Sequence, residues 1–457
     1  MNTADLAEKI VTLVGGRENI SEVLNCMTRV RVELADQDKA DVTALMELED
    51  VMGVVKDNPI QIVLGPGRAQ KVGAELRDSL KDGYVKPIPL SVDKTWEANK
   101  AAHATHHSYN AVKDVFARVS GIFTPVIPAV IAAGLCSGIG SLIGQMQAAD
   151  AGLLFYISEL LTIIGRTFFT CFTIFTGIYA AKAFGASPAL GGLLGAFILT
   201  PAFSTDPGSG GGILGVILGV MLLAQIEKFL KKYIPDSITL LITPFVSIIL
   251  SGAVYIYLIM PATGWFSEIL IRCLRFLTDS PYLVVRLIVG FALSAAFLPI
   301  VMEGYHHVFV ILYALELQLM GDISLLPCLI MAGAGQIGAS LAICNKADKV
   351  GNQRMGTIIR KALPAALFGI GEPLIYGVTL PMKKPFLTAG IGAGFGGALC
   401  LAAGVRMCAW GISGMAAIPL MKTPSMMLWF SVALLMSYSM GFVITSLFIS
   451  KGAVRNG

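Results

Sequence analysis

The chain of 457 residues is 55% hydrophobic and 14% charged, with a formal net charge of +4 and a mean hydropathy of +0.73. Soluble domains carry roughly 25% charged residues, so the composition excludes an ordinary soluble protein and indicates a chain that crosses a membrane repeatedly. The first 100 residues hold 17 acidic and 13 basic side chains, and the remaining 357 hold 13 and 21. A soluble N-terminal part thus precedes an apolar, slightly basic part, and the net charge says nothing about nucleic acid.

Periodic patterns in the first 85 residues predict a small α+β domain. Residues 4–14 carry apolar side chains at helical spacing, and a second short helix is expected to begin near Asn19. Polar and apolar residues alternate over 28–34, which is the period of a half-buried strand. A helix, two strands that form a hairpin and a last helix are expected at 39–48, 51–56, 60–64 and 69–80. We assign residues 1–85 to this domain, an antiparallel sheet with helices.

A polar stretch follows and is assigned as a linker over residues 86–112. It holds three histidines without the cysteine or carboxylate ligands of a metal site, so we expect no metal and no cofactor: His103, His106 and His107. No apolar segment opens the chain, so no secretory signal peptide is expected. The N-terminal domain should therefore remain on the cytoplasmic side.

Residues 113–457 read as an all-α polytopic membrane domain. A span takes about 20 apolar residues, and the convincing segments are 122–143, 168–184, 213–226, 238–260, 283–301, 325–344, 386–403 and 426–448. Basic clusters mark the cytoplasmic face at 228–232, 346–354, 360–361 and 383–384. Glycine and proline break the segments 188–201 and 363–380. Irregular backbone at membrane depth is tolerated only where it is buried or lines a cavity, so we expect the substrate site there.

One of the eight cysteines has polar and basic neighbours. Cys26, expected at the end of a helix-to-strand loop, is followed by Thr28, Arg29 and Arg31, whereas the other seven lie in apolar sequence and should pack as small hydrophobic residues. On a strand, Arg29 and Arg31 share a face, so both guanidiniums can bind one anion. Nearby positive charge favours the thiolate, and arginine matches phosphate oxygens. A phosphoryl-carrying cysteine is favoured over a structural or a redox-sensing one, because the domain has no resolving cysteine.

A second candidate site surrounds Glu372, which lies between Gly371 and Pro373 in the broken segment. A carboxylate at the centre of a membrane helix costs about 2.5 to 3.5 kcal/mol on insertion scales. A helix break lets the acid face a cavity, where it can accept hydrogen bonds from sugar hydroxyls. The alternative is a structural carboxylate, satisfied by backbone amides or by a lysine such as Lys384.

A third candidate is His306, which lies in an apolar stretch with Glu303 before it and His307 after it. An imidazole there can orient a sugar hydroxyl or take its proton. Glu303 and His306 are three residues apart and share a helix face, so they can also simply neutralise each other.

These motifs resemble the membrane subunits of the bacterial phosphoenolpyruvate-dependent sugar phosphotransferase system. The run at 26–31 resembles the Cys-x-Thr-Arg-Leu-Arg signature of the glucose-superfamily IIB domain, with Val30 in place of leucine, and Gly65-Pro66-Gly67 fits the same domain. The run at 369–373 resembles the IIC motif Gly-Ile-Thr-Glu, with Gly371 in place of threonine, and Gly304-x-His306 matches the upstream Gly-x-His element. Segments 332–339 and 371–381 look most like the permeases for N-acetylmuramic acid, with sucrose, trehalose and β-glucoside permeases as near relatives.

The resemblance implies a mechanism and partners. A separate EIIA protein, of the glucose type, would phosphorylate Cys26, and Arg29 and Arg31 would hold the phosphoryl group. The IIC part would bind the sugar near Glu372 and His306 and present its 6-hydroxyl to phosphocysteine. The resemblance also implies a homodimer in the bacterial inner membrane, with about ten spans and re-entrant hairpins.

Two other classes of function remain open from the residues alone. One is a proton-driven sugar transporter with a regulatory cytosolic domain, which would use Glu303, Glu372 and His306. The other is a membrane sensor in which Cys26 reports redox state.

Overall fold

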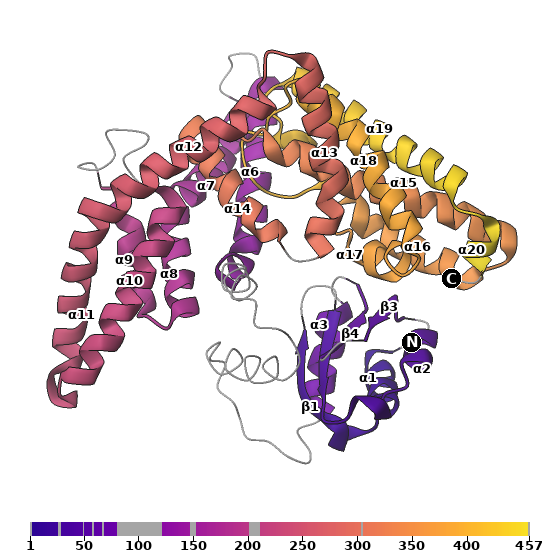
Figure 1. The fold of residues 1–457 in the computed structure, drawn as a ribbon, viewed down its shortest axis with the longest axis horizontal. Coiled ribbons are helices and arrows are strands. Elements are labelled where there is room, and N and C mark those ends of the chain that lie inside the picture. Colours follow the sequence, from indigo (N-terminus) through magenta and orange to yellow (C-terminus); the bar gives the residue numbers. More distant parts are fainter. Residues whose placement is uncertain are drawn as a thin grey trace.

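The structure is a computed structural model. It describes residues 2–25, 29–48, 50–56, 59–65, 68–79, 121–146, 152–200, 211–302 and 305–455. A small domain with a sheet lies against one end of a large helical part (Figure 1). This arrangement confirms the predicted fold class, an α+β domain followed by an all-α membrane domain.

The N-terminal domain is a four-stranded antiparallel sheet in the order β1-β2-β4-β3, packed against helices. Its sheet buries Val30, Val32 and Ile62 against Leu6 of the first helix and Leu76 of the last, so one apolar core holds it together. The elements are α1 (Thr3–Leu13), η1 (Arg17–Asn19), β1 (Ile20–Asn25), β2 (Arg29–Leu34), η2 (Gln37–Lys39), α2 (Val42–Glu47), β3 (Gly53–Val55), β4 (Ile60–Val63) and α3 (Arg68–Ser79).

The short helix predicted near Asn19 is wrong, because only the 3-10 turn η1 forms there and residues 20–25 are strand β1. The buried side chain of Asn19 explains the change. Its amide nitrogen donates to the carbonyls of Val14 and Asp36, and its amide oxygen accepts from the Asp36 backbone. These bonds fix the turn and direct the chain into a strand beside β2. Cys26 therefore follows a strand and not a helix.

The helical part contains eight helices that are long and apolar enough to cross a membrane, and three shorter apolar ones, among the described residues. The predicted spans are confirmed in outline, although the helix at 153–170 was missed and the expected span 168–184 is divided at Cys171. The elements from residue 124 to 278 are η3 (Thr124–Val126), α6 (Ile127–Met146), α7 (Leu153–Thr170), α8 (Phe172–Phe184), α9 (Pro188–Phe197), α10 (Gly212–Tyr233), α11 (Asp236–Val254), η4 (Tyr255–Ile259) and α12 (Met260–Thr278).

The remaining elements carry the broken segment. They are α13 (Leu283–Met302), α14 (His306–Met320), α15 (Leu325–Val350), α16 (Gln353–Leu367), α17 (Glu372–Leu374), the π-helix η5 (Ile375–Thr379), α18 (Lys384–Ala402), η6 (Gly414–Leu420), α19 (Pro424–Phe448) and α20 (Lys451–Arg455).

Helix α15 is the centre of the C-terminal half, with 89% of its most apolar window buried. Its glycines let neighbouring backbones approach: a Cβ at Gly335 would lie 2.3 Å from the carbonyl of Ala389 in α18, and one at Gly338 would lie 2.1 Å from that of Tyr438 in α19. Small residues at such crossings hold membrane helices together by close packing. The three helices therefore form a rigid support for the segment between α16 and α18.

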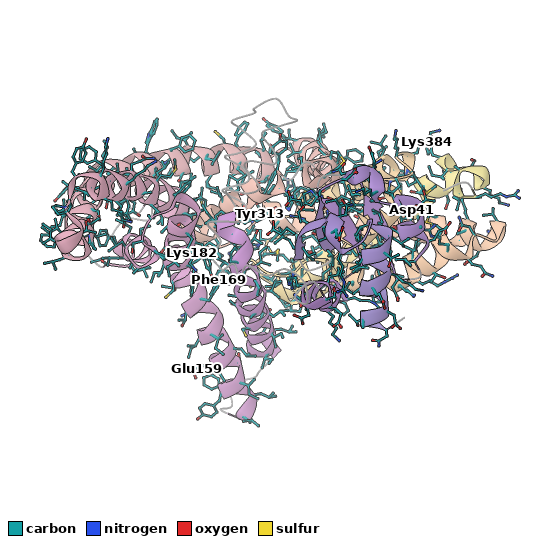
Figure 2. All side chains as sticks on the ribbon, turned by 90° about the horizontal axis from the view of Figure 1, so that it is seen from below. Asp41, Glu159, Phe169, Lys182, Tyr313 and Lys384 are labelled. Carbon is teal, nitrogen blue, oxygen red and sulfur yellow. The ribbon has the colours of Figure 1, made fainter. Side chains whose placement is uncertain are left out.

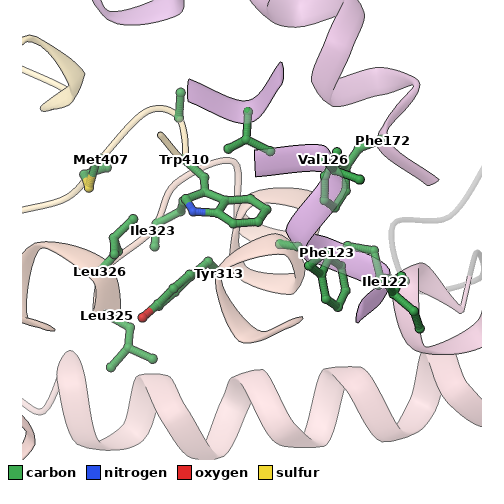
Figure 3. Packing of buried hydrophobic residues seen from close by; sticks show 14 of the residues in the cluster. Ile122, Phe123, Val126, Phe172, Tyr313, Ile323, Leu325, Leu326, Met407 and Trp410 are labelled. Carbon is green, nitrogen blue, oxygen red and sulfur yellow. The ribbon is translucent and has the colours of Figure 1, made fainter. Parts of the chain in front are cut away.

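Aromatic side chains join the two halves of the helical part. The Trp410 indole lies between Phe172 of α8 and Tyr313 of α14, with ring centroids 5.6 and 6.3 Å away (Figure 3). Helix α7, in contrast, projects from the body and leaves most of its apolar residues exposed, with Glu159 near its outer end (Figure 2). An apolar helix surface of this kind is suited to lipid.

A buried charge network closes the end of the helical part where α15 begins. The Asp322 carboxylate, 5% exposed, receives hydrogen bonds from Arg275 (2.5 Å), Arg406 (3.1 Å) and Lys422 (2.8 Å). Burial acts to raise the pKa of Asp322, but the hydrogen bonds from Lys422 and Arg275 outweigh it and lower this pKa. The ionised carboxylate thus ties α12 to the loops that precede α15 and α19.

Replacing Asp322 with asparagine should lower the free energy of unfolding by about 3 kcal/mol, because three cations lose a buried counter-charge. Unfolding by titration with sodium dodecyl sulfate measures the change. The control is Asp348→Asn, which removes an exposed pair with Arg360 and should cost less than about 1 kcal/mol. Equal losses in the two variants would contradict this account of the network.

Candidate functional site

The Glu372 segment is a helix that stops and restarts inside the C-terminal half. Helix α16 ends at Leu367, and Gly369 then adopts a left-handed backbone with φ of 91°, which side-chain-bearing residues rarely adopt. The carbonyl of Gly371 accepts from the backbone amides of Leu374 and Ile375, which starts the short helix α17. Pro373 lies in its first turn, where a missing N–H does no harm. Glu372 is thus the first residue of the restarted helix.

A second non-helical segment contacts this break. The Ser413 hydroxyl donates to the carbonyl of Gly369 at 3.3 Å. Gly414 lies so close that a Cβ there would be 2.3 Å from the carbonyl of Leu367. Both segments therefore lie against protein, as irregular backbone at membrane depth requires, and the expectation of a special backbone at 363–380 is confirmed.

Arg29 is placed by the sheet of the N-terminal domain. It opens β2 opposite Val63 of β4, and its Nη1 donates to the Oε1 of Gln61 at 2.9 Å. Its side chain is 11% exposed, and its Nε is buried without a partner among the described residues. Arg31 points to the same face of β2, as predicted, and is exposed. Strand β2 thus carries two guanidiniums on one face: that of Arg29 is held by Gln61, and that of Arg31 is exposed to solvent.

The structure brings Arg29 to the broken segment of the membrane part. Its Nη2 lies 3.9 Å from the Oε2 of Glu372, and its guanidinium carbon lies 3.8 Å from the centre of the Tyr376 ring. The cation therefore touches both an acidic and an aromatic group of the other domain. The partner that we suggested for Glu372, Lys384, is replaced in this role by Arg29.

The domain boundary has further contacts around this one. Asp50 forms ion pairs with Arg68 of its own domain at 2.7 Å and with Lys361 of α16 at 3.9 Å. Arg354 donates to the carbonyl of Met46. A cavity of about 350 Å³ lies at this seam, lined from one domain by residues 50–52, 64, 65 and 68 and from the other by residues 357, 358, 361, 364 and 365. Within the described ranges the boundary thus combines ion pairs and a hydrogen bond to a backbone carbonyl with the apolar contact of Met52 against the cluster that includes Ile358 and Val378.

Two glycines allow the closest approach between the domains. A Cβ at Gly53 of β3 would lie 3.2 Å from the Cα of Gly377, and a Cβ at Gly377 would lie 2.6 Å from the carbonyl of Met52. The start of β3 therefore lies directly on the π-helix η5, one residue after Tyr376. No larger residue fits at position 377 without moving the domains apart.

Fully buried polar groups lie beside the Glu372 segment. The Gln336 side chain of α15 donates from Nε2 to the Thr379 hydroxyl at 2.5 Å, and its Oε1 has no partner among the described residues. The hydroxyl of Ser340, one turn further along α15, also has no partner in the described part of the chain. Buried polar atoms are rarely left unsatisfied, which makes these two atoms unusual within the helical part that the structure describes.

The remaining candidates are only partly described. Cys26 and Thr28 lie outside the described residues, as do Glu303 and the side chain of His307. His306 is half-buried in the first turn of α14 and shares no hydrogen bond or ion pair with Arg29 or Glu372 within the described ranges. The structure thus joins Arg29 to Glu372 and leaves His306 on a separate helix.

Sequence reasoning missed Gln61, Tyr376 and Gly377. Tyr376 and Gly377 stand in the quoted run after Glu372, where an aromatic ring and a glycine could have indicated an approach by another group. Nothing in the local sequence distinguishes Gln61, because its role depends on the register of β2 with β4.

Both parts of the chain are similar to known proteins. The family description "phosphotransferase system, EIIB" matches residues 8–41, and "Phosphotransferase system, EIIC" matches residues 120–394. The "PTS system MurNAc-GlcNAc-specific EIIBC component" of Staphylococcus aureus, strains USA300 and NCTC 8325, is 37% identical over 479 residues, which cover 98% of this chain and 97% of that protein. A crystal structure of the transporter ChbC, the IIC component from the N,N'-diacetylchitobiose-specific phosphotransferase system, covers 73% of this chain and 93% of that one, with a TM-score of 0.49 and 11% identity.

The identity over nearly the whole chain and the two family matches confirm the resemblance seen in the sequence. They favour group translocation over a proton-driven transporter and over a redox sensor. They also imply a phosphoryl donor of the EIIA kind and a sugar acceptor. The chain belongs to the EIIBC components of the sugar phosphotransferase system, membrane proteins that take up a sugar and phosphorylate it.

Proposed function

We propose that the sugar is N-acetylmuramic acid and that its 6-hydroxyl receives a phosphoryl group from Cys26. The main support for this mechanism is the contact between Arg29 and Glu372. It places an arginine, a residue type that binds phosphate, beside the carboxylate of the broken segment. The substrate is proposed from the printed specificity of the relatives, MurNAc-GlcNAc. Sucrose, trehalose, a β-glucoside and the disaccharide MurNAc-GlcNAc are the alternatives within the same mechanism.

The transfer step follows from the residues proposed for each role. The sugar O6 attacks phosphorus, the new P–O bond forms as the S–P bond of phosphocysteine breaks, and Cys26 leaves as a thiolate. The hydroxyl proton passes to the Glu372 carboxylate, which lies next to the cation that holds the phosphoryl group. Arg29 and Arg31 neutralise charge on the phosphoryl oxygens, the largest contribution a protein makes to phosphoryl transfer. Thr28 offers a hydroxyl beside the thiolate.

The sugar is held on the membrane side in this proposal. Glu372 accepts from sugar hydroxyls, and His306 orders another part of the ring. Gly371, around which a Cβ would meet nothing within 4 Å, leaves space for the ligand, and Pro373 fixes the start of α17. Gln336 Oε1 is a buried acceptor beside this segment and suits the N–H of an acetamido group.

We propose residues 1–85 as the phosphocysteine domain, 86–112 as linker and 113–457 as transport domain. The EIIA donor is proposed to be of the glucose type, because the run at 26–31 has the glucose-superfamily pattern. The permease is proposed to act as a homodimer, with lipid and the second copy covering the exposed apolar residues of α7, α11 and α12.

Changing Cys26 to serine should abolish phosphoenolpyruvate-dependent sugar phosphorylation, because a serine hydroxyl is a far weaker nucleophile than a thiolate. Membranes are incubated with phosphoenolpyruvate, the general phosphotransferase proteins, EIIA and labelled N-acetylmuramic acid. Cys273→Ser changes an exposed cysteine of the transport part and should retain activity. Activity that survives in the Cys26 variant would refute the proposed carrier.

Changing Glu372 to glutamine should weaken sugar binding about 100-fold, because charge-assisted hydrogen bonds to the carboxylate are lost. Phosphorylation of Cys26 by EIIA should be unchanged, since it occurs on the other domain. The matched control is Glu268→Gln, which removes an exposed carboxylate of α12. Sugar binding is measured by equilibrium dialysis with N-acetylmuramic acid, and competition by the alternative sugars identifies the substrate. Normal binding by the Glu372 variant would show that the sugar lies elsewhere.

Changing Gly377 to alanine should slow phosphoryl transfer to the sugar about tenfold or more, because the new methyl group meets the Met52 carbonyl and displaces the domains. Sugar binding and phosphorylation of Cys26 should persist. Gly333→Ala is the control, a helix glycine with nothing within 4 Å of its Cβ position. Single-turnover transfer from prephosphorylated protein measures the step, and equal rates in both variants would refute the docked geometry.

A further inference from the structure

We propose that Arg29 serves two sites in turn and thereby makes sugar affinity depend on the phosphorylation of Cys26. In the unphosphorylated protein Arg29 neutralises Glu372 and covers Tyr376. Once Cys26 carries a phosphoryl group, Arg29 turns to that group and no longer competes with the sugar for either residue. This inference rests on the proposed function, because it takes Cys26 as the phosphoryl carrier and Glu372 as a sugar ligand.

The first support is that Arg29 occupies groups that a sugar uses. Its guanidinium lies 3.8 Å from the Tyr376 ring centre and 3.9 Å from the Glu372 carboxylate. An aromatic face and a carboxylate are the surfaces that bind the apolar face and the hydroxyls of a pyranose. A cation held over the ring and beside the acid competes with the sugar for both.

The second support is that the contact is weak enough to be exchanged. The separation of 3.9 Å is longer than a direct hydrogen bond, and the Glu372 side chain is 46% exposed. Solvent screens a half-exposed carboxylate, so the pair contributes little to stability although Arg29 itself is mostly buried. A phosphoryl group offers Arg29 a dianionic partner that accepts two parallel hydrogen bonds, which is the stronger interaction.

The third support is the position of the arginine within its own domain. Gln61 holds its Nη1 at 2.9 Å, and its Nε has no partner in the described ranges. Arg29 is also three residues from Cys26 in the chain. The Nε edge of the guanidinium is therefore available to an anion while Gln61 holds the other end of the side chain.

The test measures sugar affinity in the two phosphorylation states of the full chain in lipid nanodiscs. The probe is the labelled 6-deoxy form of the sugar that the wild type phosphorylates, N-acetylmuramic acid in our proposal, because it binds but accepts no phosphoryl group. We expect phosphorylated wild type to bind it about three- to fivefold more tightly than unphosphorylated wild type, the range of an ion pair that solvent screens on one side.

Two variants isolate the arginine and the cysteine. Unphosphorylated Arg29→Gln should bind the probe as tightly as phosphorylated wild type. Arg17→Gln, which removes an exposed cation of the same domain, should bind like unphosphorylated wild type. Cys26→Ser should keep the weaker affinity when phosphoenolpyruvate and the donor proteins are added, which tests the switch without altering Arg29.

Equal affinity of wild type in its two states, or an Arg29→Gln affinity no higher than that of unphosphorylated wild type, would overturn the switch. Arg29 would then be a docking residue only. If wild type phosphorylates none of the sugars in the competition series, the proposed function fails as well, and the two failures are thereby separated.

Discussion

The structure depends on where the charge of Glu372 is neutralised. A carboxylate on a helix within the apolar half of the chain is expensive unless a cation or water reaches it. The chain meets this requirement by breaking the helix at Gly369, restarting it at Glu372 and bringing Arg29 of the soluble domain to the acid. This contact between the domains therefore brings a cation to the half-exposed acid and fixes where β2 of the N-terminal domain lies against the broken segment.

Much of this arrangement could be predicted from local sequence. The alternation over 28–34 gives β2 and the shared face of Arg29 and Arg31, and the Gly-Pro pattern around Glu372 gives the helix break. Both signals are local, because strand period and helix-breaking residues act over a few positions. The family resemblance supplied the order of the two domains.

What escaped prediction depends on contacts between distant residues. The sequence predicts a helix where strand β1 forms. The turn before β1 is fixed by the side chain of Asn19, which forms hydrogen bonds with Asp36 seventeen residues later, and a local pattern does not show this contact. The approach of β3 to η5 requires glycine at 377 and is tight at Gly53, and neither glycine alone indicates a partner. Tyr376 likewise acquires its role only when Arg29 lies over its ring. Contacts between distant residues determine strand β1, the approach of β3 to η5 and the role of Tyr376, and local sequence patterns do not reveal such contacts.

The composition of the domain boundary follows from the work that the soluble domain must do. In the proposed cycle the domain leaves the Glu372 segment to be recharged by EIIA and then returns, and a large apolar interface would hold it in place. Among the described residues the boundary instead has the ion pairs Arg29–Glu372 and Asp50–Lys361 and a glycine contact, with the Glu372 and Lys361 side chains 46% and 43% exposed. Each such pair is worth at most about 1 kcal/mol. Because both domains belong to one chain, the N-terminal domain stays near the helical part, which compensates for weak contacts without making docking permanent. Close packing at Gly53 and Gly377 then fixes the position of the docked N-terminal domain. The ion pairs around it are weak enough for the domain to leave again.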